Sequence, residues 1–206
     1  MSTNREYIFR RLHSLLGVIP IGGFLVAHLT VNWFATRGEE AYNQAANFMS
    51  NLPFVYFLEA FFIFIPIILH AVYGLYIAFQ ARHNTKRFGY FRNWMFRFQR
   101  ISGVLVLIFV SWHVWETRIA AALGAEVNFQ MMADIVDNPA ALIAYIIGIT
   151  ATTFHFANGL WSFAVTWGIT VSHKSQRVAT YVSAGIFLAL TFIGLQSILT
   201  FAGILG

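Results

Sequence analysis

Four of the seven histidines in this sequence lie deep in apolar stretches: His28, His70, His113 and His155. An ionisable side chain in such surroundings is costly and usually functional, and a neutral imidazole is a common metal ligand. The chain has no cysteine. This excludes a thiolate zinc site, an iron–sulfur cluster bound by this chain and a covalently attached c-type haem. Any metal held here must therefore be bound by histidine.

The composition places these histidines inside a membrane. The chain is 58% hydrophobic and only 10% charged, whereas soluble domains carry roughly 25% charged residues. A helix needs about 20 mostly apolar residues to cross a bilayer, and five stretches are long enough. We expect an all-α integral membrane protein whose residues 1–206 form a single transmembrane domain. The predicted helices span residues 12–33, 54–80, 97–117, 139–168 and 181–205.

Local signals refine these boundaries. Asn51 with Pro53, and Asp137 with Asn138 and Pro139, are typical of helix starts, in which a polar cap precedes a proline in the first turn. Pro20 and Pro66 lie inside predicted helices and should kink them, because proline lacks a backbone donor. Residues 81–96 are so rich in charge that we expect them to form an inner loop.

The distribution of basic residues predicts the orientation. Eleven of the 13 Lys and Arg residues fall on one side of the predicted helices, and only Arg37 and Arg118 fall on the other. Basic residues in short loops remain cytoplasmic, so the N-terminus should lie inside and the C-terminus outside the cell membrane. The high pI, near 9.8, then reflects topology, and nucleic-acid binding is not needed to explain it. A basic inner face also suits docking of an acidic soluble partner.

Each of the four histidines lies sixteen residues after the expected start of its helix, which is about 24 Å along the axis. Because successive helices run in opposite directions, equal depth in sequence gives two levels in space. His28 and His113 should lie near the outer side, and His70 and His155 near the inner side. In an up-down-up-down bundle the first and third helices are diagonal, as are the second and fourth. Each level therefore has two histidines facing each other across the bundle.

Two facing histidines can hold one haem iron from both sides. Such an iron has no open position, so it should carry electrons and not bind oxygen. Gly74 and Gly159 each lie one turn after an inner histidine, where a missing side chain leaves room for a flat ring. Three turns before the histidines lie Gly17, Glu59, Ser102 and Ala144, mostly small, as expected where a helix passes the other haem. A rival interpretation is a histidine-lined membrane transporter or metal channel.

Long segments of the sequence are also familiar: NREYIFRRLHSLLG at the start, SWHVWETRIAA around His113 and FHFANGLWSFAVTWGIT around His155. Along essentially its whole length the chain resembles the dihaem cytochrome b membrane anchors of succinate:menaquinone oxidoreductases of the Bacillus type. The resemblance implies that His28, His70, His113 and His155 are the axial ligands of two b haems.

The resemblance further implies the partners. A cytoplasmic flavoprotein would oxidise succinate, and an iron–sulfur subunit would pass electrons into this anchor, which would reduce menaquinone within the membrane. The chain alone is then not expected to oxidise succinate. The same architecture could serve a quinol:fumarate reductase with reversed electron flow, and the sequence does not separate the two directions.

Further site residues are expected at both ends of the bundle. Contacts with the inner haem's propionates are predicted for Arg11, Ser14, Arg100 and Ser102, although arginines at this depth can equally extend to the membrane surface. Glu59 is expected to lie near the outer haem and to handle protons for a quinone. The alternatives are an ion pair of Glu59 with Arg37 or Arg118, and a quinone site on the inner side near Arg11 and Ser14.

The remaining histidines, His13, His83 and His173, lie in or beside inner basic segments. Their position is most simply that of residues facing solvent or lipid headgroups. We expect no special role for His83 and His173.

Overall fold

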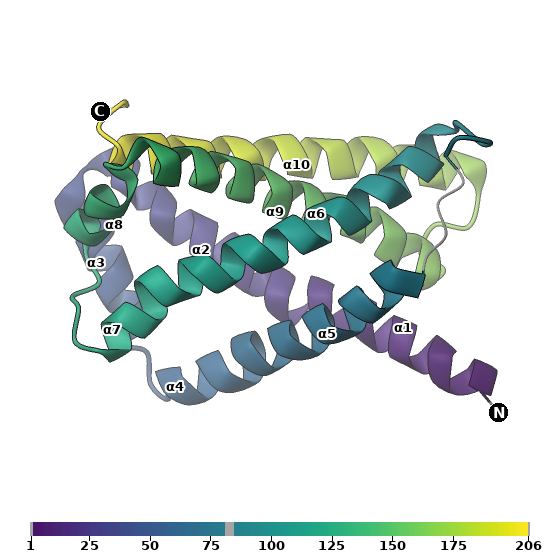
Figure 1. The fold of residues 1–206 in the computed structure, drawn as a ribbon, viewed down its shortest axis with the longest axis horizontal. Coiled ribbons are helices and arrows are strands. Elements are labelled where there is room, and N and C mark those ends of the chain that lie inside the picture. Colours follow the sequence, from purple (N-terminus) through teal and green to yellow (C-terminus); the bar gives the residue numbers. More distant parts are fainter. Residues whose placement is uncertain (1, 81–84, 206) are drawn as a thin grey trace.

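A computed structural model describes residues 2–80 and 85–205. It confirms the prediction of an all-helical protein with five helices that are long and apolar enough to cross a membrane. The chain ends lie at opposite ends of the bundle (Figure 1). His83, which we expected to have no special role, lies outside the described residues.

The spanning helices follow the predicted order but reach further into the basic segments. The helices and the shorter turns between them are α1 (Ser2–Val18), α2 (Pro20–Trp33), η1 (Phe34–Arg37), α3 (Glu39–Ser50), α4 (Val55–Leu58), η2 (Glu59–Phe64), α5 (Ile65–Gln80), α6 (Phe91–Val114), η3 (Trp115–Ile119), α7 (Ala120–Ala122), α8 (Phe129–Val136), α9 (Pro139–Thr166) and α10 (His173–Phe201). Residues 91–96 are therefore helical, so the expectation that all of 81–96 forms a loop is wrong. Long basic side chains allow a helix to continue beyond the hydrocarbon, since their charged ends reach water.

Both proline predictions have a structural counterpart. The first span is divided between α1 and α2 at Pro20. Pro66 lies in the first turn of α5, directly after the π-helical turn η2. Because proline cannot donate to the carbonyl four residues earlier, the helix widens in the turn before it. The regular helical hydrogen bonding is therefore interrupted beside both prolines.

One predicted helix start is confirmed and the other is wrong. The side chain of Asn138 accepts a hydrogen bond from the backbone N–H of Ala140, and Pro139 begins α9. Asn51 instead ends a helix, because its side chain donates to the carbonyl of Asn47 on α3. The chain then turns through Phe54, whose φ of 58° is left-handed, before α4 begins.

The best-buried core lies at the end of the bundle that carries the C-terminus. It is formed by Ala35, Tyr42, Ala46, Met132, Val136, Tyr145, Ile198 and Phe201. The short helices α3 and α8 cover this end (Figure 1). Neither helix was predicted, because both are too short to be recognised as membrane spans.

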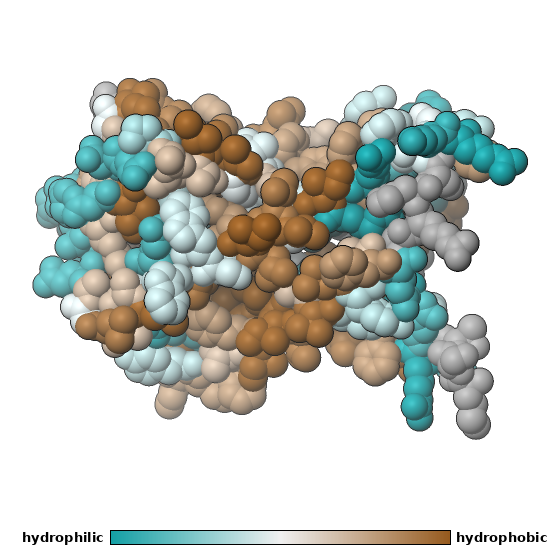
Figure 2. Space-filling model, in the orientation of Figure 1, coloured by the Kyte–Doolittle hydropathy of each residue, from teal (hydrophilic) through white to brown (hydrophobic). Residues whose placement is uncertain are grey.

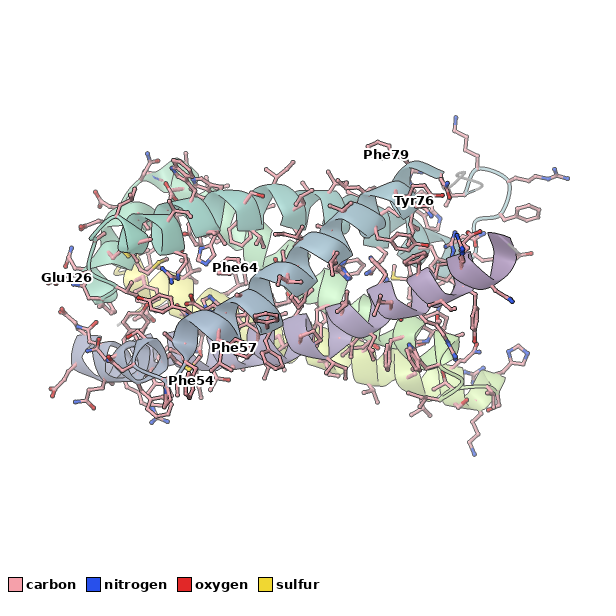
Figure 3. All side chains as sticks on the ribbon, turned by 90° about the horizontal axis from the view of Figure 1, so that it is seen from below. Phe54, Phe57, Phe64, Tyr76, Phe79 and Glu126 are labelled. Carbon is pink, nitrogen blue, oxygen red and sulfur yellow. The ribbon has the colours of Figure 1, made fainter. Side chains whose placement is uncertain are left out.

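Apolar side chains dominate the outer surface along the middle of the bundle, and hydrophilic residues gather at its ends (Figure 2). Exposed aromatic residues lie near both ends of the second span: Phe54 and Phe57 at one end, Tyr76 and Phe79 at the other (Figure 3). Aromatic residues at both interfaces and an apolar girdle between them are typical of a membrane-spanning bundle.

The packing of the first four spans positions the histidines. The first span packs against α5 and α9, and α6 also packs against α9 and α5. The first span and α6 therefore occupy opposite corners of a four-helix arrangement, as do α5 and α9. The fifth span, α10, packs outside this group against α9 and α2.

Candidate functional site

The four deep histidines form two facing pairs inside the bundle. The imidazole of His28 on α2 lies against that of His113 on α6, with 5.8 Å between the ring centres. The imidazole of His70 on α5 lies against that of His155 on α9, with 6.2 Å between the ring centres. Two imidazoles bound to opposite sides of one metal through bonds of about 2 Å have ring centres roughly 6 Å apart. Both separations fit one iron between each pair.

Hydrogen bonds orient both rings of the inner pair. The Nδ1–H of His70 donates to the carbonyl of His13 at 2.9 Å. The Nδ1 of His155 lies 3.1 Å from the carbonyl of Gln99 and 3.2 Å from the hydroxyl of Ser102. An acceptor at Nδ1 fixes the proton on that nitrogen and leaves the lone pair of Nε2 for a metal. Both inner histidines therefore have the arrangement typical of metal-binding imidazoles.

The inner acceptors belong to a polar network that joins α6 to α9. The amide of Gln99 donates to the carbonyl of His155 at 2.9 Å, and its side-chain oxygen accepts from Asn158 at 2.7 Å. Asn158 also donates to the carbonyl of Met95. Ser102 is buried and donates to the carbonyl of Gln99. This network holds the His155 ring in place and satisfies polar groups that would be costly in a membrane interior.

The outer pair is oriented by different residues. The Nδ1 of His113 shares a 3.1 Å hydrogen bond with the hydroxyl of Tyr145, which is only 2% exposed. The ring of Phe109 stacks on His113 at a centroid distance of 5.8 Å. The amide of Asn32 donates to the carbonyl of His28 and lies 3.4 Å from its Nε2. Tyr145 and Asn32 were not predicted, because nothing in their local sequence marks them as partners of a histidine.

Close helix contacts at the inner pair depend on glycines. A Cβ on Gly17 would lie 2.5 Å from the ring of His70, and a Cβ on Gly103 would lie 3.0 Å from the ring of His155. Gly17 and Ser102 therefore lie at the inner level, as their three-turn offset predicted, whereas Gly103 was not predicted. Gly74 and Gly159, in contrast, do not face the rings of His70 and His155. A Cβ on Gly74 would lie 3.1 Å from His13, and one on Gly159 would lie 3.4 Å from Gln99.

His13 is part of the inner site, whereas its place in a basic segment suggested solvent or headgroups. Its ring stacks on that of His70 at 4.0 Å between centres. Its Nε2 is buried without a hydrogen-bond partner. A bound group is one physical explanation of such an unsatisfied buried atom. The signal in the sequence was the spacing of His13 and Gly17, one helical turn apart on the face that meets the inner pair.

The four residues predicted to contact propionates lie in different surroundings. The hydroxyl of Ser102 lies within hydrogen-bond distance of Nδ1 of His155. Ser14 donates to the carbonyl of Arg11 and accepts from the indole of Trp167. Arg11 lies over the Trp167 ring at 4.6 Å and donates to the carbonyl of Thr166, and its Nε is buried without a partner. Arg100 lies on α6, half-buried, two residues before Ser102.

At the other end of the bundle Glu59 is paired with Arg118. The carboxylate accepts from both Nε and Nη2 of the guanidinium, with a shortest distance of 2.7 Å. The ion pair joins the two π-helical turns η2 and η3, and such turns are frequent at functional sites. The predicted alternative, in which Arg118 pairs with Glu59, is therefore present in the structure.

A second carboxylate was missed at this end. Glu116 lies in η3, one turn after His113, and its Oε2 is buried without a hydrogen-bond partner. Glu116 was not predicted as a site residue, because it lies at the predicted end of its helix.

Comparison with known proteins agrees with this architecture. Residues 82–195 match the family model of the succinate dehydrogenase/fumarate reductase transmembrane subunit. The chain is also 64% identical to the succinate dehydrogenase cytochrome b558 subunit of Bacillus subtilis (strain 168), over 98% of this chain and 100% of that protein. With five membrane helices and a family match over more than half its length, the chain belongs to the family of succinate dehydrogenase/fumarate reductase transmembrane subunits.

Proposed function

We propose that this chain is the cytochrome b subunit of a succinate dehydrogenase. It would anchor the flavoprotein and iron–sulfur subunits at the cytoplasmic face of the cell membrane and pass their electrons to menaquinone. The observation that carries the proposal is the presence of two facing histidine pairs, 5.8 Å and 6.2 Å between ring centres, inside a bundle of this family. Three of the four rings have a hydrogen-bond partner at Nδ1, as metal-binding imidazoles usually do, which favours haem ligands over a histidine-lined transporter.

The described residues suit two b haems. His70 and His155 would hold the inner one, and His28 and His113 the outer one. Each haem would supply a one-electron redox centre without an open iron position. The chain's own residues orient the ligands: Gln99 and the His13 carbonyl at the inner pair, and Tyr145 at the outer pair. The surrounding apolar helices exclude water from both levels.

The unpartnered donors at the inner level favour contacts with propionates. Arg11 and His13 each have a buried nitrogen without a partner. Together with Arg100 they would place positive charge and N–H donors beside the carboxylates of the inner haem. Ser102 would act indirectly, through His155, and Ser14 through the indole of Trp167, over which Arg11 lies.

The first test is the cofactor content of the chain purified with its partner subunits. We expect two b haems per chain, with a low-spin spectrum, both of which are reduced when succinate is added to the complex. The chain without its partners should show the same spectrum but should not be reduced by succinate. A purified complex without haem, or a high-spin spectrum, would favour the transporter or another site.

Tyr145 provides a separate test of the outer site. An acceptor at Nδ1 makes an imidazole a stronger donor to a metal. We therefore expect Tyr145→Phe to raise the midpoint potential of the outer haem and to leave that of the inner haem unchanged. Tyr42→Phe, which removes another buried hydroxyl at the same end, is the control. Equal shifts of both potentials in a redox titration would contradict the assignment of Tyr145 to His113.

A further inference from the structure

A polar pocket lies where three helices meet at the end of the bundle that carries the N-terminus. It has a volume of about 330 Å³ and lies between the start of α6, the end of α9 and the first two turns of α10. Its polar and charged lining comprises Arg92, His173, Gln176, Arg177 and Thr180, beside Trp161. Hydrophilic residues gather at this end of the molecule (Figure 2). We call it the basic pocket.

The helices that line the basic pocket do not balance its charge. The sequence has no Asp or Glu from residue 60 to 115 or after residue 137, so none of the three lining helices supplies a carboxylate there. His173 and Arg177 lie in the first turns of α10. The N-terminus of a helix already carries a partial positive charge, which basic residues do not offset. An anion would be favoured by both the side chains and the helix end.

Arg92 is held in place for such an anion. Its guanidinium lies 3.7 Å above the ring of Trp161 and donates one hydrogen bond to the hydroxyl of Thr180. Trp161 is itself fixed, because its indole donates to the carbonyl of Gln176 at 3.1 Å. A guanidinium has five N–H donors, and its planar fork matches the oxygens of a phosphate. A stacked, pre-oriented arginine is well suited to phosphate recognition.

A second observation indicates that the phosphate belongs to a lipid. An apolar groove of about 430 Å³ runs between the same three helices, lined among others by Phe98, Leu105, Ile147, Ala151, Phe154 and Phe187. Phe98, Phe154 and Phe187 each lie seven residues, two helical turns, from the pocket residues Phe91, Trp161 and Thr180. They therefore share a helix face with the pocket and lie about 10 Å deeper along it. Phe154 lies close to both Phe98 and Phe187, so the groove is continuous across the three helices.

We propose that the basic pocket and the apolar groove together bind one anionic phospholipid, with its phosphate in the pocket and an acyl chain in the groove. Phe91 and Tyr181, 58% and 71% exposed, flank the pocket at the membrane interface, where aromatic residues are enriched. A zwitterionic lipid would bring an ammonium group, for which the described lining of the pocket has no carboxylate. A basic pocket between membrane helices is a recognised type of site for anionic headgroups.

The test uses the purified complex of this chain with its partner subunits, in detergent micelles that contain either dioleoylphosphatidylglycerol or dioleoylphosphatidylcholine. Native mass spectrometry measures the lipid that remains bound. We expect one phosphatidylglycerol per chain, bound more tightly than phosphatidylcholine. The double variant Arg92→Gln/Arg177→Gln should weaken phosphatidylglycerol binding roughly thirtyfold, because each basic residue near a lipid surface contributes about fivefold.

Matched variants distinguish the sources of the anion. Lys86→Gln/Arg87→Gln removes the same charge from the same end of the bundle but outside the pocket, and should leave lipid binding unchanged. Ala151→Phe fills the groove and should weaken lipid binding with all charges intact. An unaltered haem b spectrum shows that each variant is folded.

Three results would overturn the proposal. Equal loss of lipid from the pocket variant and its charge-matched control would show a non-specific effect of charge. Displacement of the lipid by excess inorganic phosphate, with no effect of Ala151→Phe, would indicate a site for a soluble anion. Full lipid binding combined with loss of the partner subunits from the Arg92→Gln/Arg177→Gln variant would make this surface a docking site for an acidic protein segment.

Discussion

Replacing His70 or His155 with alanine is expected to leave the purified complex with one haem b per chain instead of two. The same result is expected for His28 or His113, but the haem that remains should be the other one. An iron held by two histidines loses half of its protein ligands in each variant, and the facing ring cannot hold it alone. The haem content per protein and the midpoint potential of the remaining haem show which haem each histidine binds.

The pairing makes this test specific. Variants of His70 and His155 should retain a haem of the same potential, and variants of His28 and His113 should share a different one. His173→Ala is the control, because His173 is exposed at the start of α10 and should leave both haems in place. Loss of the same haem from variants of His28 and His70 would show that the histidines do not bind iron in the pairs seen here.

Glu59→Gln should slow quinone reduction by succinate at least about tenfold while both haem spectra remain normal, if this carboxylate handles protons for the quinone. Positioned acids and bases typically contribute roughly 10²–10⁴-fold to rate. Glu59 lies in η2, within the span that also carries His70, and is half-buried. The measurement is the steady-state rate with a soluble menaquinone analogue, beside a spectrum of each variant.

The ion pair with Arg118 provides the control for this prediction. A purely structural pair would make Glu59→Gln and Arg118→Gln equally harmful, and the double variant no worse than either. A proton-handling role predicts that Glu59→Gln and the double variant are slow, whereas Arg118→Gln retains most of its activity. Full activity of Glu59→Gln would remove Glu59 from the mechanism. In that case Glu116→Gln is the next variant to measure, because the Oε2 atom of Glu116 is buried without a hydrogen-bond partner.

The membrane helices could be predicted from the sequence, because the hydrophobicity of consecutive residues is sufficient to identify them. A run of about 20 apolar residues is favoured in a bilayer whatever it packs against. The ends of the helices were predicted less accurately. The starts of α6 and α10 lie among basic residues, where hydropathy is low although the helix continues. The short helices α3 and α8 are amphipathic, and their apolar faces belong to a core shared with other segments, which a local pattern does not reveal.

The four histidines could also be predicted as candidate ligands from the sequence. An ionisable residue inside a membrane helix is rare, and four histidines at equal depth are unlike a chance pattern. The regular alternation of helix direction was sufficient to predict which of them face each other. The structure brings together the same two pairs. Their binding of iron stays a prediction, to be tested by the alanine variants.

The surroundings of these histidines were decided only by the tertiary structure. The partners of the Nδ1 atoms lie 32 residues away for His113 and Tyr145, 57 for His70 and His13, and 56 for His155 and Gln99. No local pattern encodes such contacts, because they depend on the rotation and crossing of two helices. For the same reason the Glu59–Arg118 pair was only one of several alternatives in the sequence. The sequence by itself determined which residues lie within the membrane, and helix packing decided which atoms meet there.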